Sequence, residues 1–149
     1  MAGCQLSVAV GELRHKLQAN RYQDLVAWQK AIEFVQRVYS ITSKLPQEEM
    51  FGLKSQMRRA AVSVPSNIAD GQGRASRGEF LQFLGHASGS LYEIETQLVI
   101  ASRLGYIPVA EHDALLMEAQ HLGRILNALI GSLKPGSRAS AFRQPTTDN

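Results

Sequence analysis

The chain has 149 residues, a formal net charge of +3 and a single cysteine. That length suits one domain with a sizeable core, and a lone Cys4 excludes an internal disulfide framework and a cysteine-based zinc site, so we expect a reducing, cytoplasmic setting. The apolar run from Leu6 to Val10 is too short and too broken for a signal sequence or a membrane span, and no membrane association is expected.

The first periodic segment predicts a helix that begins near residue 24. Asp24 stands where an N-cap would accept amide hydrogen bonds, and Leu45-Pro46 ends the element, because a residue before proline disfavours the helical conformation. Trp28 is expected to be a core residue. The apolar side chains of this segment recur three and four residues apart, as in a packing seam: Leu25, Trp28, Ile32, Val35, Tyr39 and Thr42.

A second helix is predicted from about Gly52. Pro65 lies inside it, and proline removes one backbone hydrogen bond and clashes with the carbonyl four residues back. We therefore expect a kink or a short break near Ala61. The apolar face of this helix is formed by Leu53, Met57, Ala60, Ala61, Val64 and Ile68.

Two longer helices follow. The third begins at a capping box of Ser76 and Glu79, ends at Gly105, and carries Phe83, which is expected in the core. The fourth lies between two prolines, Pro108 and Pro135. Their apolar faces repeat the seam spacing: Phe80, Leu84, Ala87, Leu91, Ile94, Leu98 and Ala101 in the third, and Leu115, Ala119, Leu122, Leu126, Leu129 and Leu133 in the fourth.

No segment alternates with a period of two over a useful length, and short turns separate four amphipathic helices. The sequence therefore predicts an all-α, antiparallel up-down-up-down four-helix bundle over residues 22–134. Disordered tails are expected on either side, an N-terminal one over residues 1–21 and a C-terminal one over residues 135–149, the latter rich in Pro, Ser, Thr and Gly.

Positive charge is concentrated on the second predicted helix and the turn after it. Residues 79–133, by contrast, carry a net charge of −4. A local positive field of this kind suits phosphate groups, and it predicts a stripe that binds nucleic acid. Five cations stand in this stripe against one acid, Asp70, for a local charge of +4: Lys54, Arg58, Arg59, Arg74 and Arg77.

The structural alternative for this stripe is that its arginines hold carboxylates. Arg58 and Arg59 point about 100° apart on a helix, so they cannot both face the same neighbour. One of them could pair with Asp70, or with Glu93 or Glu95 of the third helix, and so order the bundle.

Gly71 and Gly73 close the second helix. A dinucleotide fingerprint is excluded, because such glycines follow a strand whereas a helix precedes these. We interpret them as a helix-helix turn in which glycine permits positive φ. Alternatively, the amides at the start of the third helix, with Arg74 and Arg77 beside them, could hold a phosphate.

Other small and polar residues favour contacts between helices or between subunits. Gly85 and Gly89 lie in a run of small residues on the third helix, which permits either close helix approach or a subunit contact. Asn67 is interpreted as a local cap or as an intersubunit hydrogen-bonding group.

No catalytic constellation is found, and neither enzymatic activity nor a cofactor is expected. Glu118 and His121 have the i, i+3 spacing of a di-iron ligand pair, but their heptad positions flank the seam or lie outside it, whereas bundle ligands must project inward. A solvated polar face is the better interpretation, and no metal site is predicted.

The segment from Gln56 to Ser76, QMRRAAVSVPSNIADGQGRAS, resembles the central motif of a four-helix-bundle family. That family includes proteins encoded by intervening sequences of 23S rRNA genes and the accessory protein of diversity-generating retroelements. The segments at Asp24–Ala31, Phe80–Ser90 and Leu104–Tyr106 resemble the family as well. Asp70 stands where the family usually has Glu, a conservative departure.

The resemblance implies a homopentamer with a basic surface and, for members tied to retroelements, work with a reverse transcriptase and nucleic acid. The leading hypothesis is therefore a non-enzymatic, oligomeric bundle that binds RNA or DNA through the stripe of five cations. The alternative is a protein-interaction or scaffolding module whose arginines meet acidic surfaces of a partner or of a neighbouring subunit.

Overall fold

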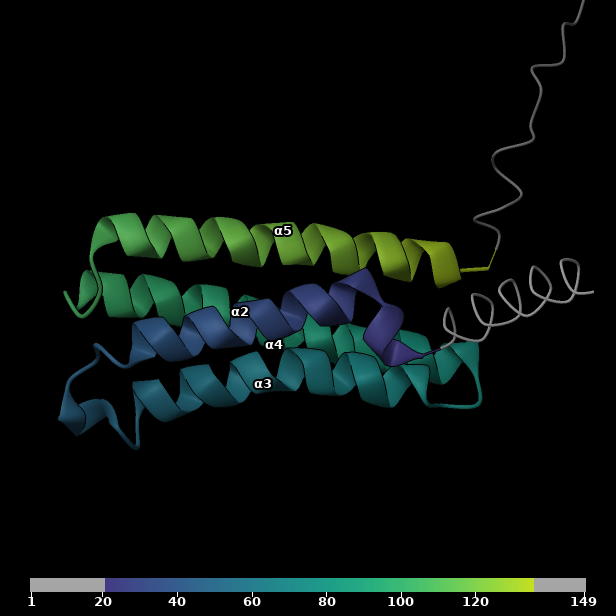
Figure 1. Ribbon diagram of the computed structural model, residues 1–149, viewed down its shortest axis with the longest axis horizontal. Helices are drawn as coiled ribbons and strands as arrows, with labels where there is room; N and C mark the ends of the chain where they lie inside the picture. Colours follow the sequence, from purple (N-terminus) through teal and green to yellow (C-terminus); the bar gives the residue numbers. More distant parts are fainter. Residues whose placement is uncertain (1–20, 136–149) are drawn as a thin grey trace, which may run out of the picture.

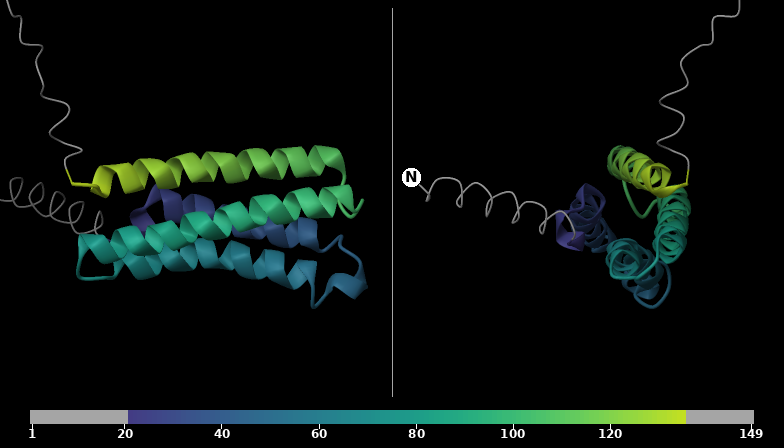
Figure 2. Two further views of the ribbon diagram at one scale, coloured as in Figure 1. Left: turned by 180° about the vertical axis from the view of Figure 1, so that it is seen from behind. Right: turned by 90° about the vertical axis from the view of Figure 1, so that its right-hand side faces the viewer.

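The computed structural model describes residues 21–135, which form four long helices joined by short turns (Figure 1). Labelled as in Figure 1, they are α2 (Val26–Thr42), α3 (Leu53–Gln72), α4 (Arg77–Arg103) and α5 (Val109–Leu133). Two short 3-10 helices, η1 (Tyr22–Asp24) and η2 (Gln47–Glu49), precede α2 and α3. Each long helix contacts the next along the chain, and α5 contacts α2. The end-on view in Figure 2 shows the four helices around a shared interior.

The predicted all-α, up-down-up-down four-helix bundle is confirmed. Residues 1–20 and 136–149 lie outside the described residues, so the disorder expected of the two tails stays a prediction. None of the described helices combines the length and the apolar character that a bilayer crossing requires.

The predicted apolar faces of α3, α4 and α5 form most of the core. In each of these helices the seam residues at the centre are buried, and Met57, Leu84, Leu98 and Leu126 have no exposed surface. Leu45 and Ile107, from the turns after α2 and α4, are buried as well. Burial of these side chains removes apolar surface from water, which is the main favourable contribution to folding.

The predicted inner face of α2 is wrong by one residue position, except at the end of the helix, where Thr42 is buried as predicted. Trp28 is only half-buried, as are Ile32 and Val35, while Tyr39 is 42% exposed. Successive residues lie about 100° apart on a helix, so this one-residue offset turns α2 by that angle. The small side chains of Ala27 and Ala31 let α2 approach its neighbours. The buried stripe consists of Ala27, Ala31, Phe34, Val38 and Thr42.

The predicted helix-end signals at Ser76 and at Gly105 are confirmed. The Ser76 hydroxyl accepts a hydrogen bond from the Glu79 amide at 3.1 Å, and Gly105 adopts a φ of 78° after α4. Asp24, in contrast, lies in η1 and does not cap α2, whose N-cap residue is Leu25. The chain turns once more before α2 begins, which displaces Asp24 from the capping position.

Helix α3 continues through Pro65, so the predicted short break near Ala61 is wrong, while the alternative of a kink there stays a prediction. Pro65 is buried against the core. Two side chains supply hydrogen bonds to carbonyls in the same turns: the Ser66 hydroxyl donates to the Val62 carbonyl and the Asn67 amide to the Ser63 carbonyl, each at 2.8 Å. The carbonyl that loses its helical donor to Pro65 is that of Ala61, four residues back, and these two bonds reach the two carbonyls that follow it.

Gly71 and Gly73 do not have the positive φ that the sequence predicts. Among the described glycines only Gly105 does. Gly71 lies inside α3 and is buried where α3 and α4 meet. A Cβ on Gly71 would lie 2.7 Å from the Phe83 Cβ and 2.9 Å from the Phe80 ring, so the absence of a side chain permits the close approach of the two helices. A Cβ on Gly73 would meet only ordinary contacts at 3.6 Å.

Candidate nucleic-acid interface

The five cations of the predicted stripe fall into two groups at opposite ends of α3. Lys54, Arg58 and Arg59 occupy its first two turns and are called here the N-terminal basic cluster. Arg74 and Arg77 lie in the α3–α4 turn and at the start of α4, and are called the turn basic cluster. Arg59 lies 13 residue steps before the end of α3 at Gln72, about 20 Å along the helix, and Arg74 lies beyond that end. The structure therefore does not join the predicted stripe into one patch.

Arg58 anchors α3 to the end of α2. Its Nε donates to the Thr42 Oγ1 at 2.9 Å, and its Nη2 donates to the Tyr39 carbonyl at 3.2 Å. The guanidinium carbon lies 4.5 Å from the centre of the Tyr39 ring. The carbonyls at the end of a helix carry partial negative charge, so an arginine is well placed there. This position makes Arg58 a structural residue.

The predicted pairing of an arginine with Asp70 or with Glu93 or Glu95 is not found among the described ion pairs. Asp70 is exposed near the end of α3, and Glu93 accepts a hydrogen bond from Gln97. The expectation that Arg58 and Arg59 differ in role does agree with the structure, because Arg59 is exposed while Arg58 is half-buried.

An open groove runs beside the N-terminal basic cluster. Its lining combines three cations with hydroxyl and apolar groups: Tyr39, Met50, Lys54, Ser55, Arg58, Arg59 and Val62. The start of α3 lies at this groove, where the Glu49 carboxylate caps the helix by accepting a hydrogen bond from the Leu53 amide at 3.0 Å. Phe51, just before α3, is 91% exposed.

Both arginines of the turn basic cluster are exposed. Arg74 places its guanidinium carbon 4.7 Å from the centre of the Phe83 ring, a cation–π contact that orients the side chain. Arg77 is the first residue of α4, so its charge adds to the positive end of that helix dipole. Phe83, predicted to be core, is half-buried under Arg74.

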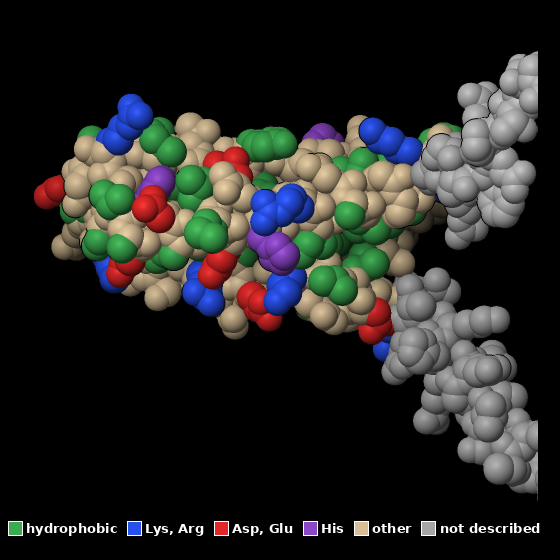
Figure 3. Space-filling view, turned by 90° about the horizontal axis from the view of Figure 1, so that it is seen from above, with side chains coloured by type: hydrophobic (Ala, Val, Ile, Leu, Met, Phe, Trp, Pro, Cys, Tyr) green, Lys and Arg blue, Asp and Glu red, His purple; other side chains and the backbone are tan. Residues whose placement is uncertain are grey.

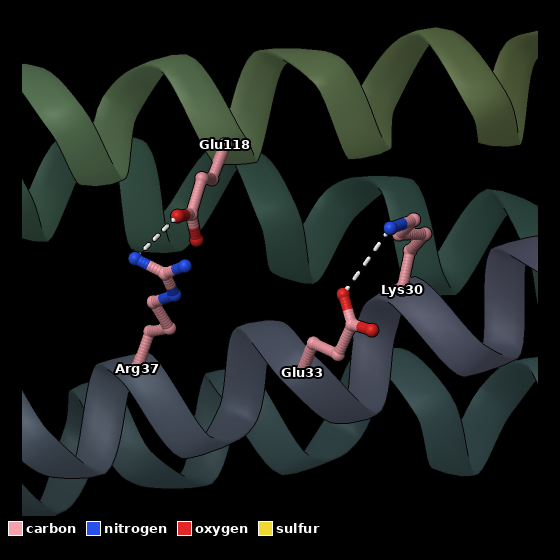
Figure 4. A network of polar contacts seen from close by, with 4 residues as sticks. All are labelled: Lys30, Glu33, Arg37 and Glu118. Atoms are coloured by element: carbon pink, nitrogen blue, oxygen red, sulfur yellow. Dashed lines mark hydrogen bonds and ion pairs between the residues drawn. The ribbon is translucent and has the colours of Figure 1, made fainter.

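The cations of α2 are neutralised, unlike those of the two clusters. Lys30 pairs with Glu33 at 3.3 Å and Arg37 with Glu118 at 2.8 Å, as Figure 4 shows. Lys44, just after α2, pairs with Glu111. Within residues 21–135, no ion pair involves a cation of either basic cluster.

The face of the bundle around α5 has a different electrostatic character. Figure 3 shows acidic, basic and histidine side chains interspersed on it. Mixed charges of this kind neutralise one another over a few ångströms, so this face does not present a field of one sign. The two basic clusters of α3 thus differ from this part of the surface.

Asn67 takes part in a hydrogen-bond network within the chain. Its Nδ2 donates to the Ser63 carbonyl and hydroxyl, and the Ser63 hydroxyl lies 2.9 Å from that of Ser90 on α4. Asn67 is therefore not a helix cap, and its described contacts tie α3 to α4. Gly85 and Gly89 lie on the outer side of α4, where a Cβ would meet nothing within 4 Å. Close approach within the chain does not explain these two glycines.

Glu118 pairs with Arg37, while His121 is exposed. In the described part of the chain, no three side chains of the types that bind metals come together.

Three features of this region were not anticipated from the sequence. They are the anchoring of Arg58 on α2, the cap supplied by Glu49, and the exposed ring of Phe51. The exposure of Phe51 could have been predicted from the sequence, because Phe51 stands in a turn and belongs to neither the apolar face of the helix before it nor that of the helix after it. The other two depend on contacts between separate elements.

A family model described as 23S rRNA-intervening sequence protein matches residues 23–128. No curated protein matches the sequence. One similar solved structure is a protein of unknown function from the S23 ribosomal protein family of Bacteroides thetaiotaomicron. It has a TM-score of 0.66 and 24% identity, over 70% of this chain and 98% of that one, a likeness that supports the fold alone.

Proposed function

Because the chain belongs to the family of 23S rRNA-intervening sequence proteins, whose model spans residues 23–128, we propose that it is a non-enzymatic, cytoplasmic protein that self-associates and binds RNA or DNA. The observation that carries this proposal is the set of cations on α3 and the following turn that have no carboxylate partner in the described structure. Phosphate groups neutralise such cations and release counterions on binding.

In this proposal the cations of the two clusters have different roles. Arg59, Arg74 and Arg77 are exposed and contact phosphates directly. Arg58 positions the start of α3 against α2, because its Nε and Nη2 donate to Thr42 and Tyr39 of α2. The exposed Phe51 ring, close in sequence to Lys54, offers a surface on which an unpaired base can stack.

Replacing both Arg74 and Arg77 with alanine is expected to weaken binding to mixed-sequence RNA or DNA. Each lost phosphate contact should reduce the magnitude of the log–log salt slope by about 0.7–0.9. The measurement is fluorescence anisotropy of a labelled oligonucleotide at several salt concentrations. The thermal midpoint and the oligomer mass should stay nearly unchanged, since neither side chain is buried.

The matched control removes two other exposed arginines, Arg103 and Arg124, which also have no ion pair in the described structure. This control has the same net charge as the test variant, so it separates local contact from overall charge. Equal loss in both variants would contradict a specific interface. If the intact protein does not bind at low salt, and loss of Arg74 and Arg77 splits the oligomer, the arginines serve subunit contacts and the scaffolding function replaces this one.

Self-association is the second part of the proposal, with a homopentamer as the expected state. Light scattering at micromolar concentration should give about five times the chain mass of 16.4 kDa. The outward-facing Gly85 and Gly89 support a subunit contact on α4, so changing both to leucine should lower the oligomer mass. Gly131→Leu is the control, because its Cβ position is also open within the chain. A monomer at high concentration would contradict this part.

A further inference from the structure

Among the described residues, the groove beside the N-terminal basic cluster is lined by cations and by no acid. Lys54 and Arg59 contribute charge to it, and neither forms an ion pair within residues 21–135. The two grooves between α2 and α5, in contrast, have acids beside their cations, Glu118 among them. The lining of the N-terminal groove therefore favours an anionic ligand, and phosphate is a group that both lysine and arginine bind.

Aromatic and apolar side chains accompany these charges. Tyr39 lines the groove with 42% of its surface exposed, and the Arg58 guanidinium carbon lies 4.5 Å from the centre of its ring. Because Arg58 is itself held by hydrogen bonds to the end of α2, this wall is ordered before any ligand binds. Met50 and Val62 also line the groove, and both are exposed. The groove thus offers flat and apolar surface as well as charge, and nucleobases stack on such surfaces.

Phe51 adds an exposed ring at the edge of the groove. Met50, the residue before it, and Lys54, three residues after it, both line the groove, so the Phe51 backbone lies beside it. The ring is 91% exposed, and among the described residues it makes no aromatic or cation–π contact. Packing within the described chain therefore does not explain a phenylalanine at this position, whereas stacking on a base gives the ring a role.

The turn basic cluster differs from this groove in the state of its aromatic ring. Phe83 is half-buried, and the Arg74 guanidinium carbon lies 4.7 Å from the ring centre, so this ring is less able to receive a base. Bases of a duplex are stacked within the helix and present only their edges, whereas bases of a single strand are free to stack on side chains. An exposed ring beside unpaired cations therefore favours unpaired nucleotides at the N-terminal groove.

We propose that the N-terminal groove binds unpaired nucleotides of RNA or DNA. Lys54 and Arg59 contact the phosphates, and the rings of Phe51 and Tyr39 stack on the bases. The groove has a volume of about 540 Å³, within the range of sites that hold small organic ligands, which leaves room for a nucleotide. The chain therefore prefers single strands to duplexes, a preference that rests on the proposed function of nucleic-acid binding.

Phe51→Ala is expected to weaken binding of a labelled, mixed-sequence single strand by about 5- to 150-fold, the usual effect of removing one stacking ring. Binding to the duplex of the same sequence should stay nearly unchanged. Fluorescence anisotropy at one low salt concentration gives both affinities, with each probe made once in RNA and once in DNA. The thermal midpoint of the variant should equal that of the unaltered chain, because the Phe51 ring is exposed and supports no packing in the described structure.

Three further variants separate stacking from other effects. Phe51→Tyr keeps an aromatic ring and should keep single-strand binding. Phe51→Leu keeps an apolar side chain without the ring, and it should weaken single-strand binding as alanine does. Met117→Ala removes an apolar side chain that is 69% exposed on α5, outside the N-terminal groove, and should leave binding to both probes unchanged.

The single-strand preference and nucleic-acid binding as such fail in different ways. If Phe51→Ala binds the single strand as well as the unaltered chain does, or loses affinity equally for both probes, the preference is overturned and the proposed function stands. Equal affinity of the unaltered chain for the two probes has the same meaning. If the unaltered chain binds neither probe at low salt, the proposed function is overturned, and the preference with it.

Discussion

Replacing Gly71 with alanine is expected to lower the free energy of unfolding by about 1–3 kcal/mol, the usual cost of overpacking. The new Cβ would lie 2.7 Å from the Phe83 Cβ, an atom that cannot move without the α4 backbone. Alanine normally gains about 0.5–1 kcal/mol over glycine inside a helix, and the clash outweighs that gain. Urea denaturation followed by circular dichroism measures the difference.

Gly73→Ala is the matched control for this prediction. The position is two residues away, and its new Cβ would meet the nearest carbonyls at an ordinary 3.6 Å. Its φ of −77° is also open to alanine. The control should therefore keep the stability of the unaltered chain within a few tenths of a kcal/mol, as is common for surface substitutions. Equal stability of the two variants would contradict the close packing of α3 on α4 at Gly71.

Phe34→Ala is expected to cost about 3–5 kcal/mol of stability, the range for removing a large buried aromatic side chain. Phe34 is 2% exposed and belongs to the inner stripe of α2. Trp28→Ala should cost less, although tryptophan is the larger residue, because Trp28 is only half-buried. The same denaturation experiment compares the two variants. A larger loss for Trp28→Ala would mean that α2 presents the face that the sequence predicted.

A same-residue comparison on α2 removes the effect of side-chain size. Val38 has no exposed surface, whereas Val35 is half-buried. Truncation of each to alanine deletes the same atoms, so the stability loss should be greater at position 38. Reversal of that order would again support the outer stripe as the core face.

The inner faces of α3, α4 and α5 could be predicted because each has one dominant apolar stripe. The residues on it, such as Met57, Leu98 and Leu122, are buried in the structure. Helix α2 has two adjacent stripes, and the larger side chains, Trp28 and Ile32 among them, belong to the outer one. The apolar periodicity and the side-chain sizes of α2 therefore favoured the outer face as the core face. Neither property depends on how closely a neighbouring helix approaches α2.

The residues of the candidate site could be predicted from the sequence, but their arrangement in space could not. The five cations can be counted from the sequence, but their separation into two clusters follows from the length of an unbroken α3. Arg58 and Arg59 are chemically identical neighbours. Only the position of Tyr39 and Thr42 at the end of α2 makes one of them an anchor and leaves the other exposed.

Local interactions explain what the sequence by itself determined: four helices in up-down order, the Ser76 cap and the turn at Gly105. These depend on the periodicity of one segment or on bonds between residues a few positions apart, so the information lies within each segment. Tertiary structure alone decided the rotation of α2, the role of Gly71 and the use of Arg58. Each of these depends on the distance between atoms of different helices, which is defined only when the helices pack together.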